Sequence, residues 1–416
     1  MLENFLREYN VNRVFLSITG LWPFQSKSVR NFLRTFFFLL EISYFFFEIM
    51  LLYDYWDNPQ MIFDGSYQLA MSLSFVGRQA NEFWNRDKLR RLYLTIDEHW
   101  NIFTNDVEIR VMKDYSMLSR KFTKYYSRLM YSIMIILVTL PLTPLLLDIV
   151  APLNEPRPRF FAVEINEFRM NKDDHFLLIF CYTSVVIVVG ANIAMGVDTM
   201  HVACTAHACS LFAAISKQIE NITSKANNQH INEIRERKYC MNMKLDPLNE
   251  EIIYREFVLC LKKHQLAIDI YFRFVNTLDS SYQGIALLLL ILLIGTISLI
   301  AVRIVYVLNQ VEEVIKFMFI FTACLVTLMI VSYSGQRLID ESQNIFHRAY
   351  AAEWYMFSPR LKSLLIITLY RSNIPCGLKA GNMIPLSIAT YAAYEPPCHT
   401  LQRLHHSKSD FLLTFH

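Results

Sequence analysis

The chain has 416 residues, of which 54% are hydrophobic and 14% aromatic, and its mean hydropathy is +0.26. A chain this apolar does not fit an ordinary soluble domain, and its composition indicates a membrane protein that crosses the bilayer several times. The formal net charge of only +3 gives no reason to expect a nucleic-acid partner.

The predicted elements begin with a mixed polar segment, residues 1–31, and continue with six apolar segments within residues 32–334. Apolar runs of about twenty residues cross about 30 Å of hydrocarbon as helices, at about 1.5 Å per residue. The second run is shorter and carries Asp64, so it is the weakest of the six. The predicted spans are 32–53, 61–76, 129–147, 176–197, 285–308 and 314–333.

Two carboxyl groups lie inside the first predicted span. Glu41 and Glu48 are seven residues apart, a spacing that returns almost to the same face of a helix. Because charge is costly in hydrocarbon, we expect both side chains to face the interior of the helix bundle, paired or protonated.

A seventh helix is predicted to be interrupted. Residues 335–371 read as an amphipathic helix in which Leu338, Ile345 and Ala349 recur at helical spacing. Polar residues and Pro375 then break the pattern, because proline removes an amide donor and disfavours helix in the residue before it. A second apolar run covers residues 383–393. The predicted fold is therefore an all-α membrane protein with seven transmembrane helices, the last of them broken into two halves.

The distribution of basic residues predicts the orientation. Segment 78–128 contains eleven Lys or Arg residues, whereas 54–60 contains none and 151–175 contains four. Helical extensions at 78–128 and 198–283 lie on the same predicted side as the amino-terminus. The positive-inside rule therefore predicts a cytoplasmic amino-terminus, and seven spans then predict an extracellular carboxyl-terminus. This orientation is the reverse of that of a G-protein-coupled receptor.

The stretch from Gly335 to Ser387 resembles the carboxyl-terminal signature of insect odorant receptors. The matching residues are Gly335, Glu341, Ser342, Ala349, Tyr350, Trp354, Tyr355, Arg360, Arg371, Ser372, Pro375, Leu378, Ala380, Pro385, Leu386 and Ser387. The resemblance implies that residues 335–371 form the cytoplasmic half of the seventh helix, an anchor for assembly, and that 372–393 form its membrane half, which lines a pore. Within this stretch the expected pore and assembly residues are Tyr350, Trp354, Tyr355, Arg371, Ser372, Pro375, Pro385 and Ser387.

The same resemblance implies a cation channel, gated by small volatile odorants and assembled with a common olfactory co-receptor, as a tetramer. It implies a multi-pass protein in the plasma membrane of olfactory sensory neurons. From the location of aromatic, thioether and hydroxyl side chains in the outer halves of the spans, the expected ligand-binding residues are Tyr67, Met71, Val138, Phe180, Ser184, Met318 and Thr322.

The sequence departs from the family pattern after Ala393. Family members continue the pore half of the seventh helix for more than two further turns, whereas residues 394–416 are a polar tail with Pro396, Pro397 and several charges. Such a segment does not continue a membrane helix, so the predicted pore region is truncated. The sequence thus predicts an impaired subunit, or one that depends on its partners for the pore.

The sequence is also compatible with other function classes. A gustatory receptor of the same superfamily is one alternative, because Thr390 and Tyr391 match its pattern, although the following Gln-Phe is missing. A G-protein-signalling chemoreceptor is another. No HExxH, P-loop or GxSxG motif occurs, so we expect no enzyme, no catalytic residue and no cofactor.

Three cysteine and histidine residues have the chemistry of metal ligands. His201, Cys204 and His207 follow one helical stripe, but their spacing matches no strong zinc signature, and we expect no metal. The eight cysteines form no CxxC pair and lie mostly in or near apolar runs. We therefore expect them to be small buried side chains rather than a disulfide framework.

Overall fold

A computed structural model shows the fold of the chain. It describes residues 2–151 except 104, residues 175–237, residues 286–351 and residues 359–394 except 382, together with residues 157, 159, 161, 163, 251, 252, 254, 255, 258, 259, 262 and 354. The predicted polar tail, apart from its first residue, lies outside the described residues, as does most of the predicted extension 238–283.

The described elements are almost all helices. In chain order they are α1 (Glu3–Ile18), α2 (Lys27–Asp54), α3 (Pro59–Trp84), α4 (Arg86–Ile102), α5 (Asp106–Thr139), the short 3-10 helix η1 (Leu140–Leu142), α6 (Thr143–Val150), α7 (Phe176–Arg237), the helix Ala286–Tyr306, α9 (Val311–Tyr350), α10 (Pro359–Ser372), β1 (Lys379–Ala380), β2 (Ile384–Pro385) and α11 (Ile388–Tyr394).

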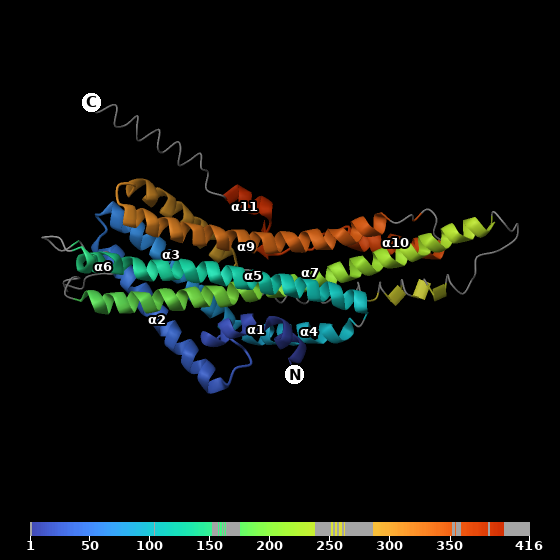
Figure 1. The fold of residues 1–416 in the computed structure, drawn as a ribbon, viewed down its shortest axis with the longest axis horizontal. Coiled ribbons are helices and arrows are strands. Elements are labelled where there is room, and N and C mark those ends of the chain that lie inside the picture. The colour runs from blue at the N-terminus through green and yellow to red at the C-terminus, as the bar shows by residue number, and fades with distance from the viewer. Residues whose placement is uncertain are drawn as a thin grey trace, which may run out of the picture.

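Three long helices, α5, α7 and α9, run side by side along the long axis and form the centre of the molecule (Figure 1). The hairpin of α2 and α3 packs against α7, and α1 packs against both α5 and α7. Below, "the loop end" denotes the end where tight connections join α2 to α3 and the helix Ala286–Tyr306 to α9. "The basic end" denotes the opposite end, where α1 and α4 pack.

Five described helices are long and apolar enough to cross a bilayer: α2, α5 with α6, α7, the helix Ala286–Tyr306 and α9. The predicted second span lies within α3, which is long enough at 26 residues but less apolar. The reason is that α3 buries Asp64, Gln68 and Arg78 against its neighbours. The shorter α11 has seven residues, which extend about 10 Å as helix.

One predicted boundary is wrong. The sequence pattern places residues 335–350 in the seventh helix, but in the structure they continue α9 without a break. Neither Ser334 nor Gly335 interrupts the hydrogen-bonded helix, and the buried positions Leu328, Leu338 and Ile345 keep one face directed at the core. The interruption predicted around Pro375 is present, because α10 ends at Ser372 and α11 begins at Ile388.

The sequence pattern predicts no element in the amino-terminal segment, yet Glu3–Ile18 is a helix with one buried face, formed by Phe5, Glu8, Tyr9, Asn12 and Leu16. Aromatic rings fix it at the basic end. Phe5 lies 5.2 Å from Tyr93 and 5.9 Å from Trp22, measured between ring centroids, and Trp22 stacks on Tyr93 at 5.4 Å. Aromatic pairs of this kind stabilise packing beyond the area they bury.

The small β-hairpin between α10 and α11 docks on α9 at Gly335. A Cβ atom at this glycine would lie 2.2 Å from the backbone oxygen of Leu386. Two further contacts hold the hairpin region, because the amide of Cys376 donates to Ser342 Oγ at 2.9 Å and Leu386 N donates to Leu378 O at 2.9 Å. Glycine at residue 335 therefore permits the close approach of the chain that leads into α11.

This contact gives a test. Replacing Gly335 by alanine should displace the hairpin from α9 and destabilise the protein by roughly 1–3 kcal/mol, the usual cost of overpacking. The matched control is Gly295→Ala, because a Cβ at residue 295 meets no atom within 4 Å. The midpoint of thermal unfolding in detergent should fall for the first variant and not for the second; equal midpoints would contradict the account of Gly335.

Candidate functional site

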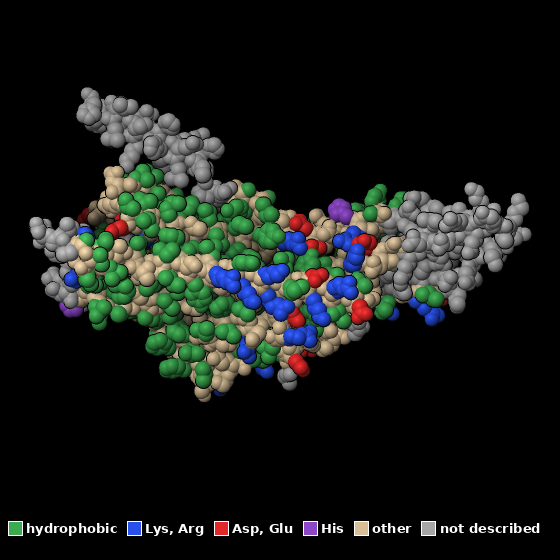
Figure 2. Space-filling model, in the orientation of Figure 1, with side chains coloured by type: hydrophobic (Ala, Val, Ile, Leu, Met, Phe, Trp, Pro, Cys, Tyr) green, Lys and Arg blue, Asp and Glu red, His purple; other side chains and the backbone are tan. Residues whose placement is uncertain are grey.

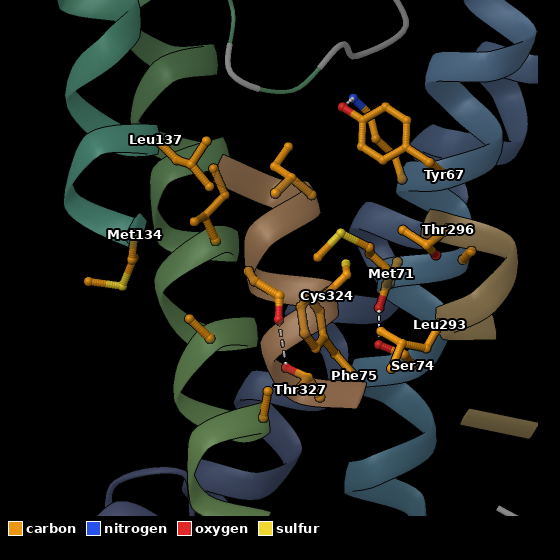
Figure 3. A pocket seen from close by; sticks show the side chains of 18 of the residues that line it. Tyr67, Met71, Ser74, Phe75, Met134, Leu137, Leu293, Thr296, Cys324 and Thr327 are labelled. Atoms are coloured by element: carbon orange, nitrogen blue, oxygen red, sulfur yellow. Dashed lines mark hydrogen bonds between the residues drawn. The ribbon is translucent and has the colours of Figure 1, made fainter. Parts of the chain in front are cut away.

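A cavity of about 190 Å³ lies among the membrane helices, between α3, α5, α7, the helix Ala286–Tyr306 and α9 (Figure 3). Its lining is mostly apolar. An engineered apolar cavity of about 150 Å³ can hold benzene, so this volume suits a small organic molecule.

The lining side chains come from all five of these helices. They include Tyr67, Met71, Ser72, Ser74, Phe75 and Arg78 of α3, Tyr126, Met130, Ile133, Met134 and Leu137 of α5, Thr183, Val186, Ile187, Ala191, Ala194 and Met195 of α7, Leu289, Leu292, Leu293 and Thr296 of the helix Ala286–Tyr306, and Ile320, Ala323, Cys324 and Thr327 of α9.

Most hydroxyl groups in this lining are already satisfied by their own helices. Ser74 Oγ donates to Met71 O at 2.7 Å, Thr296 Oγ1 to Leu292 O at 2.7 Å and Thr327 Oγ1 to Ala323 O at 3.0 Å. Ser72 differs, because its buried hydroxyl has no hydrogen-bond partner among the described residues. A bound molecule that offers one acceptor would satisfy it.

An ion pair closes the cavity toward the basic end. Arg78, which lines the cavity, donates from Nε and Nη2 to the two carboxylate oxygens of Asp198 on α7, at 3.1 and 3.4 Å. Tyr126 of α5 hydrogen bonds to Asp198 and lies 3.5 Å from the Thr327 hydroxyl of α9. One charged pair thus connects α3 with α7, and the tyrosine extends the network to α5 and α9.

A second buried ion pair lies toward the loop end. Arg303 donates from Nε and Nη2 to both oxygens of Asp64 on α3, at 2.9 Å each. Beside it, the ammonium of Lys316 lies 2.8 Å from Glu313, and the same ammonium lies 4.7 Å from the ring centroid of Phe317. Phe317 in turn makes an edge contact with Tyr67 of the cavity lining, with centroids 5.6 Å apart.

The two glutamates of the first span are both fully buried, as expected from their spacing. Glu48 hydrogen bonds to Tyr44, a residue of the cavity lining. Glu41 has no hydrogen-bond partner for either oxygen among the described residues. An ionised carboxylate without a partner is costly in hydrocarbon, so Glu41 is expected to carry a proton.

The structure brings together two of the seven residues expected to bind ligand. Tyr67 and Met71 line the cavity. The other five lie elsewhere on their helices: Met318 and Thr322 are exposed on the outer face of α9, and Val138, Phe180 and Ser184 are half-buried outside the lining. The helices α7 and α9 are apolar over most of their circumference in the membrane, so the sequence does not show which face turns inward.

Several lining residues were missed for this reason. On α3 a signal was present, because Phe75 and Arg78 continue the face of Tyr67 and Met71 at steps of four and three residues. On α9 the lining residues Ile320, Cys324 and Thr327 lie on the side opposite to the predicted pair, and nothing in the sequence distinguishes the two faces.

The expected pore and assembly residues lie in the stretch from the end of α9 to the start of α11. Ser372 and Ser387 are buried, and Tyr350, Trp354, Pro375 and Pro385 are exposed. Ser387 caps α11, because its hydroxyl accepts from the amide of Thr390 at 3.2 Å. Tyr355 and the side chain of Arg371 lie outside the described residues.

In the histidine stripe of α7, His207 packs against α4 at the basic end. The rings of His207 and His99 of α4 stack at 5.3 Å, and a hydrogen bond of 3.1 Å joins His99 Nδ1 and His207 Nε2. Burial lowers the pKa of His99 to about 4 and, together with the neighbouring His99, lowers the pKa of His207. Both rings are therefore neutral at pH 7.

Comparison with solved structures shows the fold. The chain is similar to the insect olfactory receptor OR5 from Machilis hrabei in complex with eugenol, with a TM-score of 0.70 over 94% of this chain and 95% of that chain, at 13% identity. A second structure of OR5 gives a TM-score of 0.68 at 15% identity over 97% of each chain. The predicted all-α fold with seven transmembrane helices is confirmed by this likeness.

Curated relatives match over shorter segments. Odorant receptor 67a of Drosophila melanogaster is 34% identical over 110 residues, 26% of this chain and 25% of that protein. Putative odorant receptor 92a of Drosophila melanogaster is 29% identical over 83 residues, 20% of each chain. The chain therefore matches only about a fifth to a quarter of the length of these relatives.

The model of the 7tm Odorant receptor family matches residues 58–394. This range begins at the first turn of α3 and ends at the last residue of α11, so it includes all the described helices that line the cavity except α2, which contributes Tyr44. Because the family model covers most of the sequence, the chain belongs to the odorant receptor family of insects.

Proposed function

We propose that this odorant receptor binds small volatile molecules in the cavity between α3, α5, α7, the helix Ala286–Tyr306 and α9, and that binding gates a cation channel formed with olfactory co-receptor subunits. The observation that carries the proposal is an apolar cavity of about 190 Å³ placed between two buried ion pairs. The proposal requires no catalytic residue and no cofactor.

The lining sets the class of ligand. Met71, Phe75 and Leu293 offer dispersion contacts, and the Ser72 hydroxyl offers one hydrogen bond, so the best ligands are apolar molecules with a single acceptor such as a ketone or an ester. A ligand with about ten heavy atoms would bind with a Kd of roughly 1–200 µM. The structurally similar receptor OR5 from Machilis hrabei was solved in complex with eugenol.

Gating requires that the ligand bind one state of the channel more tightly than the other. Helix α9 provides the connection, because Ala323, Cys324 and Thr327 line the cavity while the same helix, further along, contacts α10 and α11. A ligand that shifts α9 also shifts the segment 372–393, which the family resemblance assigns to the pore. Since α11 is much shorter than the bilayer, the co-receptor supplies most of the pore wall in this proposal.

The proposed orientation places the basic end in the cytoplasm and the loop end outside the cell, in a plasma membrane. Support comes from the basic side chains of α4 and the first half of α5, which gather at one end of the apolar surface (Figure 2). The proposed site of action is the olfactory sensory neuron.

Orientation is tested with epitope tags at the two ends of the chain. In unpermeabilised cells, antibody should reach the carboxyl-terminal tag and not the amino-terminal tag, because the tag before α1 lies with the basic end. Permeabilised cells, in which both tags should be stained, are the control. Labelling of the amino-terminal tag in intact cells would reverse the topology.

The cavity is tested with two neighbouring residues of α9. Ala323→Leu places a larger side chain in the cavity, whereas Thr322→Leu changes an exposed position one residue away. With the co-receptor present, Ala323→Leu should reduce the sensitivity of odorant-evoked current to a panel of ketones at least about tenfold, about 1.4 kcal/mol of binding energy.

The Thr322→Leu variant should respond like the unchanged chain, and both variants should reach the cell surface in equal amounts. If Ala323→Leu kept its sensitivity while the control lost it, the ligand would bind on the outer face of α9 and the proposal would be wrong.

A further inference from the structure

Helix α5 carries a line of exposed basic side chains along one face. Arg110, Lys113, Lys121, Lys124 and Arg128 are all exposed, and their spacing of three, eight, three and four residues keeps them on one side of a helix. Figure 2 shows Lys and Arg side chains gathered over the middle of the molecule, next to a surface that is mostly hydrophobic toward the loop end.

The same face of α5 continues into the membrane. Beyond Arg128, Leu129 and Ile135 are exposed at 41% and 56%, as expected for side chains that contact lipid tails. Lys121 lies only seven residues, or about 10 Å, from Arg128. Lys121, Lys124 and Arg128 therefore lie at the depth of the lipid headgroups, and Arg110 lies about 27 Å from Arg128.

These three side chains have no acidic partner in the described part of the chain. Their neighbour Arg120 turns to the other side and pairs with Glu8 of α1 at 3.3 Å. Lys121, Lys124 and Arg128 form no ion pair with a described residue, and the Arg128 guanidinium lies 5.8 Å from the ring centroid of Tyr125. Their positive charge is thus not neutralised by the described residues and can attract an anionic partner.

Neighbouring apolar side chains support the same depth. Tyr125 is 67% exposed, and an exposed tyrosine beside basic residues is typical of the interface between headgroups and hydrocarbon. Helix α1 runs alongside at this level, because Asn12 donates to Thr123 at 3.2 Å and Phe15 contacts the ring of Tyr131. Its Val14 and Ile18 are exposed, which suits a helix at the membrane surface.

We infer that Lys121, Lys124 and Arg128 form a binding site for the phosphate groups of anionic phospholipids in the adjoining leaflet. The inference rests on the proposed orientation, which makes this the cytoplasmic leaflet, where anionic lipids are concentrated. It does not depend on odorant binding. Phosphoinositides suit the site best, because their phosphorylated headgroups project from the leaflet toward the three charges.

The test uses the purified full-length chain in detergent and a fluorescent short-chain phosphatidylinositol bisphosphate as the probe, with binding followed by anisotropy. In the variant Lys121→Gln with Lys124→Gln, affinity for the probe should fall roughly 25-fold, about fivefold per charge removed. The matched control, Arg110→Gln with Lys113→Gln, removes the same charge from the same face at a greater distance from the membrane and should stay within about twofold.

Both pairs are exposed, so both variants should unfold at the temperature of the unchanged chain, and Lys121→Arg with Lys124→Arg should retain probe affinity. Equal weakening in the two glutamine variants would overturn the inference, because it would show attraction by net charge alone. Unchanged probe affinity in the variant Lys121→Gln with Lys124→Gln would also overturn the inference. So would an acidic peptide helix that binds this face as tightly as the lipid probe does. Loss of odorant response with lipid binding intact would instead count against the proposed function.

Discussion

Two buried ion pairs constrain the arrangement of the helices. A buried arginine without a partner is costly, so Arg303 fixes the helix Ala286–Tyr306 against Asp64, and Arg78 is fixed against Asp198 of α7. Asp64 and Arg78 both belong to α3. That helix is therefore held by charge at two levels, about 21 Å apart along its axis. Its low hydropathy is the consequence of these buried polar residues.

The cavity lies between these two pairs, and this position accounts for its chemistry. The charged groups at each of its ends form an ion pair with each other. Most hydroxyl groups along its walls donate to backbone carbonyls of their own helices, so the surface that remains available to a ligand is apolar. A volatile ligand can fill such a space by dispersion without competing for hydrogen bonds. Because α9 borders the cavity and also carries the hairpin at Gly335, the ligand and the segment before α11 share one rigid element.

Much of the fold can be predicted from the sequence, because a long apolar segment in a bilayer satisfies its backbone hydrogen bonds by forming a helix. Tyr67 and Met71 could be predicted as lining residues since α3 is polar on one face, whereas Met318 and Thr322 could not be distinguished from Ile320 and Cys324 on a helix that is apolar all round. The continuation of α9 through Gly335 was missed for a different reason. The predicted apolar span ends at residue 333, and the polar and charged residues that follow are typical of a separate amphipathic helix, so the sequence does not show that both belong to one helix.

The most direct measurement is a double-mutant cycle on Asp64 and Arg303, read as the amount of folded protein at the cell surface and as odorant-evoked current with the co-receptor. Asp64→Asn and Arg303→Gln should each cause severe loss, because each leaves one buried charge unpaired at a cost of about 3–5 kcal/mol. The double variant, in which neither member of this pair is charged, should recover most of both readouts. Single variants that behave like the unchanged chain, or a double variant as poor as the two losses combined, would contradict the account.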